Sequence, residues 1–509
     1  MLWLALHFRH LPLEVFTRGT LSNAQLIAIT TGAETGATAT ATATVMAANR
    51  PAQARGVCAG MSVSAACALA SELHTIARDP AKEHATLKRI AAWALQFTSL
   101  VSIADSGEVL LEIEGSLKLF GGLNKLHQHI ARGVAELGFN ASIACAPTPL
   151  AAQWFARAGV NVRIQHQDAL RHALEKLPAD LICDNATTRD LLESFGARTL
   201  GDCLQLPRDG LARRAGQRLL DQLDRALGTR PDPRLPFVAP QTYNAMLPLP
   251  APVANADALL FAARRLLAEL CGWLTATGHG VQRPKFEFIH EKQIVTIITL
   301  ELASATRDLD HLTTLLRERL ARTELPCAAI EIAIASGRVV PLASRNLAFL
   351  PDSAGQAESA SRFVERLNAR LGANTICGLT PHADYRPERA WRACQPGAAI
   401  DSNDVNVGEN ASRSPMSSRP LTRSLTRPLW LLTMPRPLRE TSETNAAPHD
   451  HEGGPLSLLA GPERIEAGWW DGQHVARDYF VARNQAQSLL WIYRERNVAA
   501  RWYVHGFFS

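Results

Sequence analysis

The chain has 509 residues, a hydrophobic content of 47% and a formal net charge of +5. This length suffices for about three or four domains with buried cores, and the mild positive charge is compatible with nucleic acid without requiring it. No run of about 18 apolar residues occurs and the nine cysteines stand singly, so the sequence excludes a membrane span and a paired-cysteine metal or disulfide site, and we expect a soluble, cytoplasmic protein.

Residues 1–165 predict alternating strands and helices. The first element is the apolar run LWLALHF at 2–8, closely followed by Pro12, which indicates a buried strand. Further strands are predicted at 26–30, 99–104, 109–113 and 141–144, and helices at 63–73, 85–93 and 123–137. The Ala-, Thr- and Gly-rich stretch 33–44 indicates a low-complexity loop.

Three stretches of this domain resemble the Y-family (DinB/UmuC-like) DNA polymerases. VMAANRPAQARGVCAGM at 45–61 is similar to the fingers motif, and EVLLEI at 108–113 falls where the family has its second acidic palm motif. ASIACAPTPLA at 141–151 resembles the palm segment that closes the sheet. The resemblance implies that residues 1–165 form a palm and fingers.

The residues that would carry polymerase chemistry depart from the family pattern. An active member has two aspartates one residue apart on the first strand, facing the metal ions because alternate strand residues share a face; Ala5 and His7 stand there. The catalytic aspartate of the second motif aligns with Gly107 and its neighbouring glutamate with Glu108. Two-metal catalysis needs clustered carboxylates, so we predict no catalytic residue, no metal and no cofactor. A shifted alignment is disfavoured because no acid precedes Glu14.

Other family positions are also altered. The triphosphate-contacting tyrosine and arginine of the fingers align with Arg50 and Gln53, and Ala152 replaces a usual palm lysine. We interpret His7 as a packed strand histidine rather than a ligand. An alternative remains open, in which an active, divergent Y-family translesion polymerase uses Glu108 and Glu112 with a third acid.

Residues 166–240 predict a small helical domain, which the resemblance makes the thumb. Its segment FGARTLGD, which includes Gly196 and Arg198, is similar to a helix-hairpin-helix turn. Gly196 would permit a tight turn with exposed N–H groups that suit a phosphate. We expect Gly196, Arg198, Arg213 and Arg214 to contact DNA; a merely solvated helix face is the alternative.

Residues 241–343 follow a stiff proline-rich linker and predict a helix–strand–strand–helix–strand order. The elements are expected at 256–274, 281–289, 293–302, 309–320 and 327–335. This order resembles the little finger of the family, which lies along duplex DNA. Arg283 and Lys285 stand where that domain usually places cations that contact the DNA backbone.

Residues 344–395 are expected to hold a clamp-binding segment and a helical extension. Asn346, Leu347, Phe349 and Leu350 resemble the pentapeptide by which bacterial polymerases bind the ring-shaped sliding clamp, with Asn in place of Gln. Such a peptide buries aliphatic and aromatic anchors in a groove. The alternative is a hydrophobic strand end that packs on its own domain.

The last third changes in composition. Residues 396–427 are rich in Arg, Ser, Asn and Pro and predict a disordered linker. Residues 428–509 contain GPLSLLAGPERIEAGWWDG, VARDYFVAR and LLWIYR, which predict a small antiparallel sheet rich in aromatic residues and arginine. That composition is typical of an interface, although a self-contained sheet core explains about half of these residues equally well.

Over nearly the whole chain, these features resemble the ImuB family, the catalytically inactive Y-family homologues of bacterial mutagenesis cassettes. The resemblance implies an α+β, multidomain fold of palm, fingers, thumb and little finger plus a small β-rich C-terminal domain. It implies an adapter for damage-induced (SOS response) translesion synthesis that binds damaged DNA and the beta sliding clamp. Its further partners would be a RecA-like protein (ImuA) and a DnaE-type error-prone polymerase (ImuC). A DNA-binding structural protein without protein partners is a third possibility.

Overall fold

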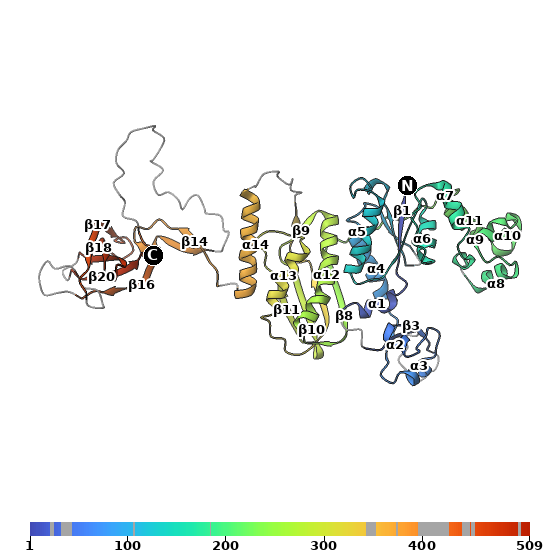
Figure 1. Ribbon diagram of the computed structural model, residues 1–509, viewed down its shortest axis with the longest axis horizontal. Coiled ribbons are helices and arrows are strands. Elements are labelled where there is room, and N and C mark those ends of the chain that lie inside the picture. Colours follow the sequence, from blue (N-terminus) through green and yellow to red (C-terminus); the bar gives the residue numbers. More distant parts are fainter. Residues whose placement is uncertain are drawn as a thin grey trace, which may run out of the picture. The chain divides into compact units, whose positions relative to one another are not determined.

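The structure is a computed structural model (Figure 1). It describes residues 1–20, 25–31, 43–104, 107–183, 185–342, 353–372, 375–394, 427–439, 448, 454–496 and 500–508. The chain divides into two compact units, Met1–Gly372 and Ala373–Ser509. The predicted α+β, multidomain fold is confirmed. None of the helices described is long and apolar enough to cross a membrane, and the nine cysteines are free.

The first sheet of unit 1 is built around its N-terminal strand. Its four strands run in the order β5-β6-β1-β7, and β1 pairs antiparallel with both neighbours. Leu4 and Leu6 pack with residues of α4 and α5, whereas Trp3 and Ala5 pack with residues of α6. The bounds are β1 (Trp3–His7), β5 (Val101–Ile103), β6 (Val109–Glu112), β7 (Ser142–Ala146), α4 (Pro80–Ala94), α5 (Leu123–Glu136), α6 (Pro149–Arg157) and the 3-10 turn η1 (Glu114–Ser116).

A small three-stranded sheet follows β1 in sequence and has the order β3-β2-β4. Its elements are α1 (Leu11–Thr17), β2 (Ile27–Thr30), β3 (Val45–Ala48), α2 (Arg50–Ala54), α3 (Val63–Leu69) and β4 (His74–Ala77). β2 pairs antiparallel with β3 and parallel with β4. The sequence did not predict β4, because its four residues are mostly exposed and show no apolar pattern.

The helical domain after the first sheet shares its core. Its helices are α7 (Gln167–Leu174), η2 (Ala179–Ile182), α8 (Ala186–Ser194), α9 (Leu200–Gln205), α10 (Arg208–Ala215) and α11 (Gln217–Leu227). Leu170, Leu192 and Leu223 pack in one cluster with Phe155 of α6. The two parts therefore have a continuous apolar core.

A second four-stranded sheet has the order β11-β10-β12-β8 and carries α12 and α13 on one face (Figure 1). The bounds are β8 (Asn244–Val253), α12 (Ala256–Thr277), β9 (His279–Val281), β10 (Lys285–His290), η3 (Glu291–Gln293), β11 (Val295–Thr299), α13 (Leu309–Leu320), β12 (Ala329–Ala335) and β13 (Val339–Pro341), of which β13 pairs with β9. β8 was not predicted, because Pro248, Pro250 and Pro252 argue against a strand. Its place at the sheet edge explains why they are tolerated.

A buried ionic network joins the first sheet's domain to the second. Glu269 of α12 is fully buried and accepts hydrogen bonds from Arg18 at 2.5 Å, Arg89 of α4 at 3.0 Å and the Tyr243 hydroxyl at 2.8 Å. Burial alone would raise the pKa of Glu269, but Arg18 and Arg89 hold it below its ordinary value. Ala268 beside it packs in the core of the first sheet. The little-finger region therefore lies fixed on the palm.

The segment predicted as one extension, residues 344–395, is divided between the two units. Helix α14 (Ser353–Leu371) packs on α13, where Glu365 Oε2 lies 2.7 Å from His311 Nε2 and Arg362 donates to Asp308 at 2.9 Å. β14 (Gly378–Pro381), η4 (Pro387–Arg389) and β15 (Trp391–Cys394) belong instead to unit 2. The boundary between the units therefore falls after α14. The ionic contacts of α14 are with residues of unit 1, whereas Arg386 of the hairpin region contacts Asp471 of unit 2.

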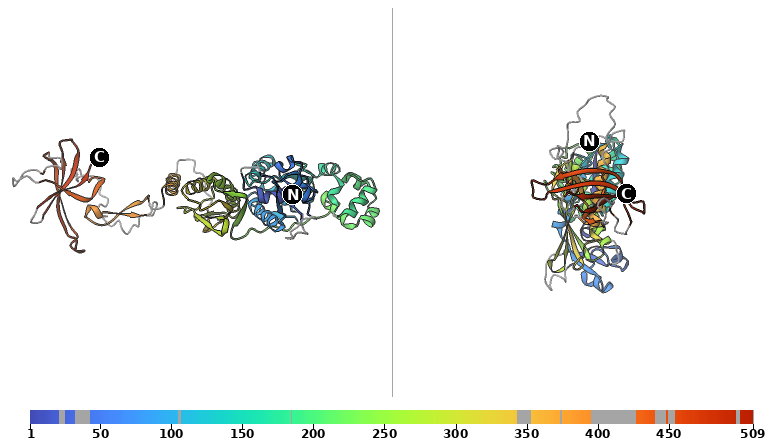
Figure 2. Two further views of the ribbon diagram at one scale, coloured as in Figure 1. Left: turned by 90° about the horizontal axis from the view of Figure 1, so that it is seen from below. Right: turned by 90° about the vertical axis from the view of Figure 1, so that its left-hand side faces the viewer.

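Unit 2 contains a five-stranded antiparallel sheet in the order β16-β20-β19-β18-β17, which confirms the predicted C-terminal sheet (Figures 1 and 2). Its strands are β16 (Trp430–Pro437), β17 (Ser457–Ala467), β18 (Val475–Arg483), β19 (Leu489–Glu495) and β20 (Trp502–Phe507). On one face Tyr479, Trp491, Tyr493 and His505 stack, with the Tyr479 and Trp491 ring centroids 4.1 Å apart. These aromatic residues are buried and form the domain's own core.

Candidate functional site

The register of the first sheet gathers the altered palm positions on one face. Ala5 pairs with Leu110 and Trp3 with Glu112 across β1 and β6. His7 follows on the same face, and its Nδ1 atom lies 3.1 Å from Oε1 of Glu108. The sheet thus places Ala5, His7 and Glu108, three of the altered positions, on one face.

Ala5 lies in an apolar setting. It has no exposed surface and packs in a cluster that includes Ala152 and Phe155 of α6. Ala5 and Ala152 therefore pack in one apolar core, where the family pattern would place an aspartate and a lysine. Gly107 has φ of +90°, a backbone conformation that an aspartate rarely adopts.

Glu108 is fully buried and both of its carboxylate oxygens are engaged within the chain. Arg157 Nε donates to Oε1 at 2.5 Å and Arg157 Nη2 to Oε2 at 3.1 Å, while Gln153 Nε2 donates to Oε2 at 2.9 Å. With His7, three side chains surround this one carboxylate. A fixed guanidinium supplies the positive charge next to Glu108 that a metal ion supplies in a two-metal site.

Helix α6 positions these partners, which the sequence reasoning missed. Thr148 caps its N-terminus by accepting the Ala151 N–H, and Pro149 begins it. Gln153 and Arg157 are four residues apart, so they project from one face of the helix toward β6. The four-residue spacing was the only signal in the sequence, because Arg157 lies far from Glu108 along the chain.

The other carboxylate of the strand and the fingers positions have their own contacts. Glu112 Oε1 accepts the N–H groups of Leu2 at 3.1 Å and Glu114 at 3.2 Å. Gln53 donates to the Ala48 carbonyl at 2.7 Å, and Arg50 is exposed at the start of α2. In the parts of the chain that the structure describes, no three His, Cys, Asp or Glu residues form a group that could hold a metal ion.

The predicted helix-hairpin-helix turn has the expected geometry but not the expected free N–H groups. Gly196 adopts φ of +73° with open space around it. Asp202 Oδ2 accepts the N–H groups of Arg198 at 3.0 Å and Thr199 at 2.9 Å, in a capping box with the Thr199 hydroxyl. The contact with the Thr199 N–H is the largest cause that lowers the pKa of Asp202. A phosphate would therefore be bound by side chains, not by this turn's backbone.

Arginine side chains do lie beside this turn. Arg198, Arg213 and Arg214 are exposed, and the Arg214 guanidinium lies 5.4 Å from the Phe195 ring centroid. Arg208 on the same helix is ion-paired with Asp224 at 2.6 Å. The predicted DNA contacts of the thumb are thus accessible, and their role remains a proposal.

The predicted little-finger cations are paired with acids. Arg283 donates to Glu301 at 2.8 Å, and the Lys285 ammonium lies 2.7 Å from Glu287. Both are partly exposed, but their charge is locally compensated. This pairing weakens the case that they hold a DNA backbone.

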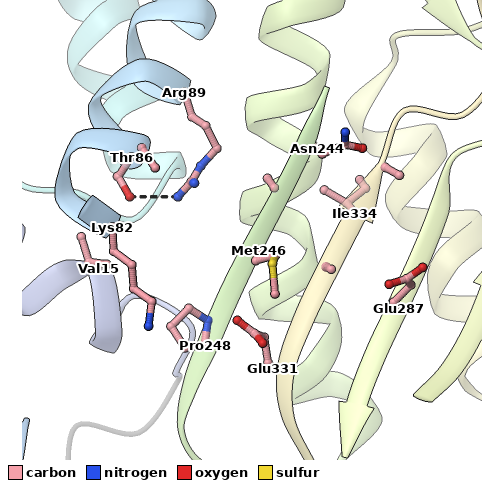
Figure 3. Close-up of a pocket in the computed structure, with 14 residues that line it drawn as sticks. Val15, Lys82, Thr86, Arg89, Asn244, Met246, Pro248, Glu287, Glu331 and Ile334 are labelled. Carbon is pink, nitrogen blue, oxygen red and sulfur yellow. Dashed lines mark hydrogen bonds between the residues drawn. The ribbon is translucent and has the colours of Figure 1, made fainter. Parts of the chain in front are cut away.

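A groove of about 510 Å³ lies between α4 and the open face of the second sheet, where Lys82, Thr86 and Arg89 face the strands of Met246, Glu287 and Glu331 (Figure 3). Burial raises the pKa of Glu331, and Lys82 opposes that shift. The two glutamates make this wall of the groove unfavourable for phosphates.

Asn346, Leu347, Phe349 and Leu350 lie outside the described residues, as do residues 396–426 of the predicted linker. The clamp assignment therefore rests on the sequence alone.

In unit 2, the predicted interface residues separate into buried and exposed sets. Tyr479 and Trp491 belong to the core, whereas Trp469 and Trp470 are exposed.

Comparison with known proteins agrees with this architecture. Residues 14–157 match the model of the impB/mucB/samB family. This match covers most of the region in which the sequence resembles the palm and fingers of the Y-family polymerases, and it agrees with that resemblance.

One particular relative covers most of the chain. Protein ImuB of Caulobacter vibrioides, found in two strains, is 27% identical over 484 residues, which span 89% of this chain and 100% of that protein. The resemblance to ImuB predicted from the sequence is therefore confirmed.

Solved structures of DNA polymerases are also similar, at lower sequence identity. An insertion ternary complex of Dbh DNA polymerase is 16% identical, covers 66% of this chain and 98% of its own, and has a TM-score of 0.38. A DinB family error-prone DNA polymerase from Sulfolobus solfataricus is 17% identical over 67% of this chain and 100% of its own, with a TM-score of 0.35.

Proposed function

We propose that this chain is a non-catalytic adapter for damage-induced, error-prone translesion DNA synthesis. It binds DNA and the sliding clamp, and it recruits a RecA-like accessory protein and a DnaE-type polymerase. The similarity to ImuB over most of the chain supports the membership of a mutagenesis cassette.

The observation that carries the non-catalytic part is the environment of Glu108. This carboxylate, at the one acidic position that the sequence keeps, is buried and held by Arg157, Gln153 and His7. A two-metal site needs several carboxylates open to the ions, and a guanidinium already compensates this one. Ala5 and Gly107 supply no oxygen ligand from their side chains.

The alternative, a divergent active polymerase, relies on Glu108 and Glu112 together with a third acid. Each of these carboxylates already accepts hydrogen bonds from the chain itself, which favours a structural role for both. Nucleotide incorporation by the purified protein distinguishes the two functions.

A reconstitution tests the adapter part. The sliding clamp on primed DNA, a DnaE-type polymerase and a RecA-like protein are mixed with and without this chain, and retention of the polymerase on clamp-loaded DNA is measured. We expect retention only when this chain is present. If the chain binds DNA but retains none of the three proteins, it is a DNA-binding structural protein without these partners.

A further inference from the structure

Unit 2 contains a cavity of about 460 Å³ between the β14–β15 hairpin and the turn from β17 to β18. Trp391 of β15 and Trp470 of the turn line it, with 49% and 54% of their surface exposed. Trp469 beside Trp470 is 75% exposed and Tyr385 is 72% exposed. Four large, exposed aromatic side chains thus come from the segments that line the cavity, although apolar rings normally avoid solvent.

A buried arginine holds this arrangement in place. Arg386, whose side chain is only 3% exposed, donates to Asp384 at 2.6 Å and to Asp471 at 2.7 Å. Its guanidinium lies 5.7 Å from the Trp470 ring centroid. The hydrogen bonds from Arg386 are the main cause that lowers the pKa of Asp471 to about 2, so this ion pair persists at any physiological pH. The aromatic rings are therefore presented by a fixed turn.

Three arginines, Arg386, Arg389 and Arg392, and three acids, Asp384, Glu388 and Asp471, line the cavity. Each of these acids is paired with an arginine, Asp384 and Asp471 with Arg386 and Glu388 with Arg477. Arg389 donates to Asp471 at 2.9 Å, and Arg386 bridges Asp471 and Asp384, so these two guanidinium groups face two carboxylates. Arg392 is exposed and contacts a histidine, His382, at 2.8 Å rather than an acid. The described residues of unit 2 carry twelve arginines against seven aspartates and glutamates, and no lysine. Arginine both binds phosphate and stacks on planar rings.

We propose that this surface binds single-stranded nucleic acid. We call it the Trp–Arg patch, and it consists of Tyr385, Arg389, Trp391, Arg392, Trp469 and Trp470. Unpaired bases would stack on the tryptophan rings while Arg389 and Arg392 hold the phosphates. The cavity is within the size range of small-ligand pockets, which suits one nucleotide. Because bases in a duplex already stack on one another, the patch favours a single strand.

Exposed tryptophan and arginine also occur at protein interfaces, so charge decides between the occupants. Arg392 on the rim of the cavity contacts a histidine rather than an acid, and arginines outnumber acids among the described residues of the unit, which favours a polyanion. The proposal goes beyond the adapter function, because it depends neither on an inactive palm nor on any partner protein.

The test uses the full chain and a labelled oligothymidylate of about 20 nucleotides, with binding measured by fluorescence anisotropy. Arg213→Ala and Arg214→Ala are present throughout, so that the thumb contributes little. In this background, Trp391→Ala and Trp469→Ala are each expected to weaken binding at least about fivefold. Trp469→Phe keeps a stacking ring and should retain most of the affinity, which separates stacking from misfolding.

Trp430→Ala is the matched control. Trp430 is a tryptophan of the same sheet with 72% of its surface exposed, and it pairs with Phe507. The register places that pair at the end of the strands opposite to the Ala467–Val475 pair that flanks the patch. The control should bind the oligothymidylate as the parent does.

Arg389→Ala with Arg392→Ala should lower the slope of log affinity against log salt by about 1.4, because two phosphate contacts are lost. The proposal is overturned if these arginine variants and the tryptophan variants bind the oligothymidylate as the parent does. It is also overturned if the patch variants lose only the clamp, the RecA-like protein or the polymerase, which would make the patch a protein-docking surface.

Discussion

Arg157 Nε lies 2.5 Å from Oε1 of Glu108, a carboxylate with no exposed surface in the palm. Arg157 ends α6 and Glu108 immediately precedes β6, and the apolar core containing Ala5 and Ala152 lies beside them. An internal ion pair therefore lies where the family pattern would place a metal-binding acid. Because a buried ion needs its partner, this pair favours a structural role for Glu108.

Removal of Arg157 should leave Glu108 buried without its main counter-charge. We expect Arg157→Ala to lower the free energy of unfolding by about 3 kcal/mol. Adding Glu108→Gln should restore part of the loss, because the uncompensated charge is then removed. Urea unfolding followed by circular dichroism measures both.

Arg163→Ala is the control, because Arg163 is exposed and bonded to Asn124. We expect it to lower the free energy of unfolding by less than about 0.5 kcal/mol. An Arg157→Ala variant as stable as the parent would show that the pair contributes nothing.

Acid should destabilise unit 2 through His505. Burial lowers the pKa of His505 to about 4 from its ordinary 6.5, and Tyr479 bonds to its Nδ1 atom at 2.8 Å. Because the unfolded chain binds the proton more tightly, this stability is present above pH 6.5 and is lost as pH falls toward 4. We expect a loss of about 2 kcal/mol over that window.

This pH effect is measured by equilibrating the chain in urea at each pH and then pulse-labelling the peptides of β18 to β20 by hydrogen exchange at a fixed pH. His505→Phe should flatten the dependence between pH 6.5 and 4. His474→Gln, at a half-exposed position, should leave it unchanged. If the Phe variant retains the slope of the parent, another group is responsible.

The thumb arginines, and not the little-finger cations, should carry duplex binding. Arg213→Ala with Arg214→Ala should weaken binding to all sequences alike and lower the salt slope by about 1.8, whereas Arg283→Ala with Lys285→Ala should change little. The physical reason is that Arg283 and Lys285 are paired with Glu301 and Glu287. Titration of duplex DNA at several salt concentrations checks this. If Arg283→Ala with Lys285→Ala weakens duplex binding more than the thumb variants do, the main DNA contact lies in the little finger.

Clamp binding should depend on the segment that begins at Asn346. Leu347→Ala with Phe349→Ala is expected to abolish it, because each buried anchor contributes about 1–3 kcal/mol. Affinity for the purified sliding clamp is measured by surface plasmon resonance, with DNA binding as a check on the fold. Phe363→Ala removes a nearby aromatic residue of α14 that is 62% exposed, and it should have no effect. Clamp binding by the double variant equal to that of the parent would place the contact elsewhere.

Local sequence patterns predicted much of the fold because they report on local burial. The apolar run around Leu4 gave β1, and the spacing of Leu309–Leu320 gave α13 with its observed bounds. β8 was not predicted, because its prolines argue against a strand although an edge strand tolerates them. The β14–β15 hairpin was not predicted, because its residues are largely exposed. Patterns of burial carry no signal for such strands.

The site was less accessible to prediction, because its contacts join distant residues. The alignment identified Ala5, His7 and Glu108, but nothing in it paired Glu108 with Arg157 across 49 positions. The thumb turn shows the opposite case. The Thr199–Asp202 capping box has a readable spacing, and it would have shown that the N–H groups there are already bonded.

Primer extension by the purified full-length protein, with Mg²⁺ or Mn²⁺ on undamaged and lesion-containing templates, tests the non-catalytic assignment most directly. We predict no incorporation by the parent, by Ala5→Asp or by His7→Asp, under conditions in which an active Y-family polymerase extends the same primer. Glu112→Ala, which leaves the Arg157–Glu108 pair intact, should behave like the parent. Incorporation at the rate of an active Y-family polymerase, abolished by Glu108→Ala or by Glu112→Ala in a folded variant, would contradict the account.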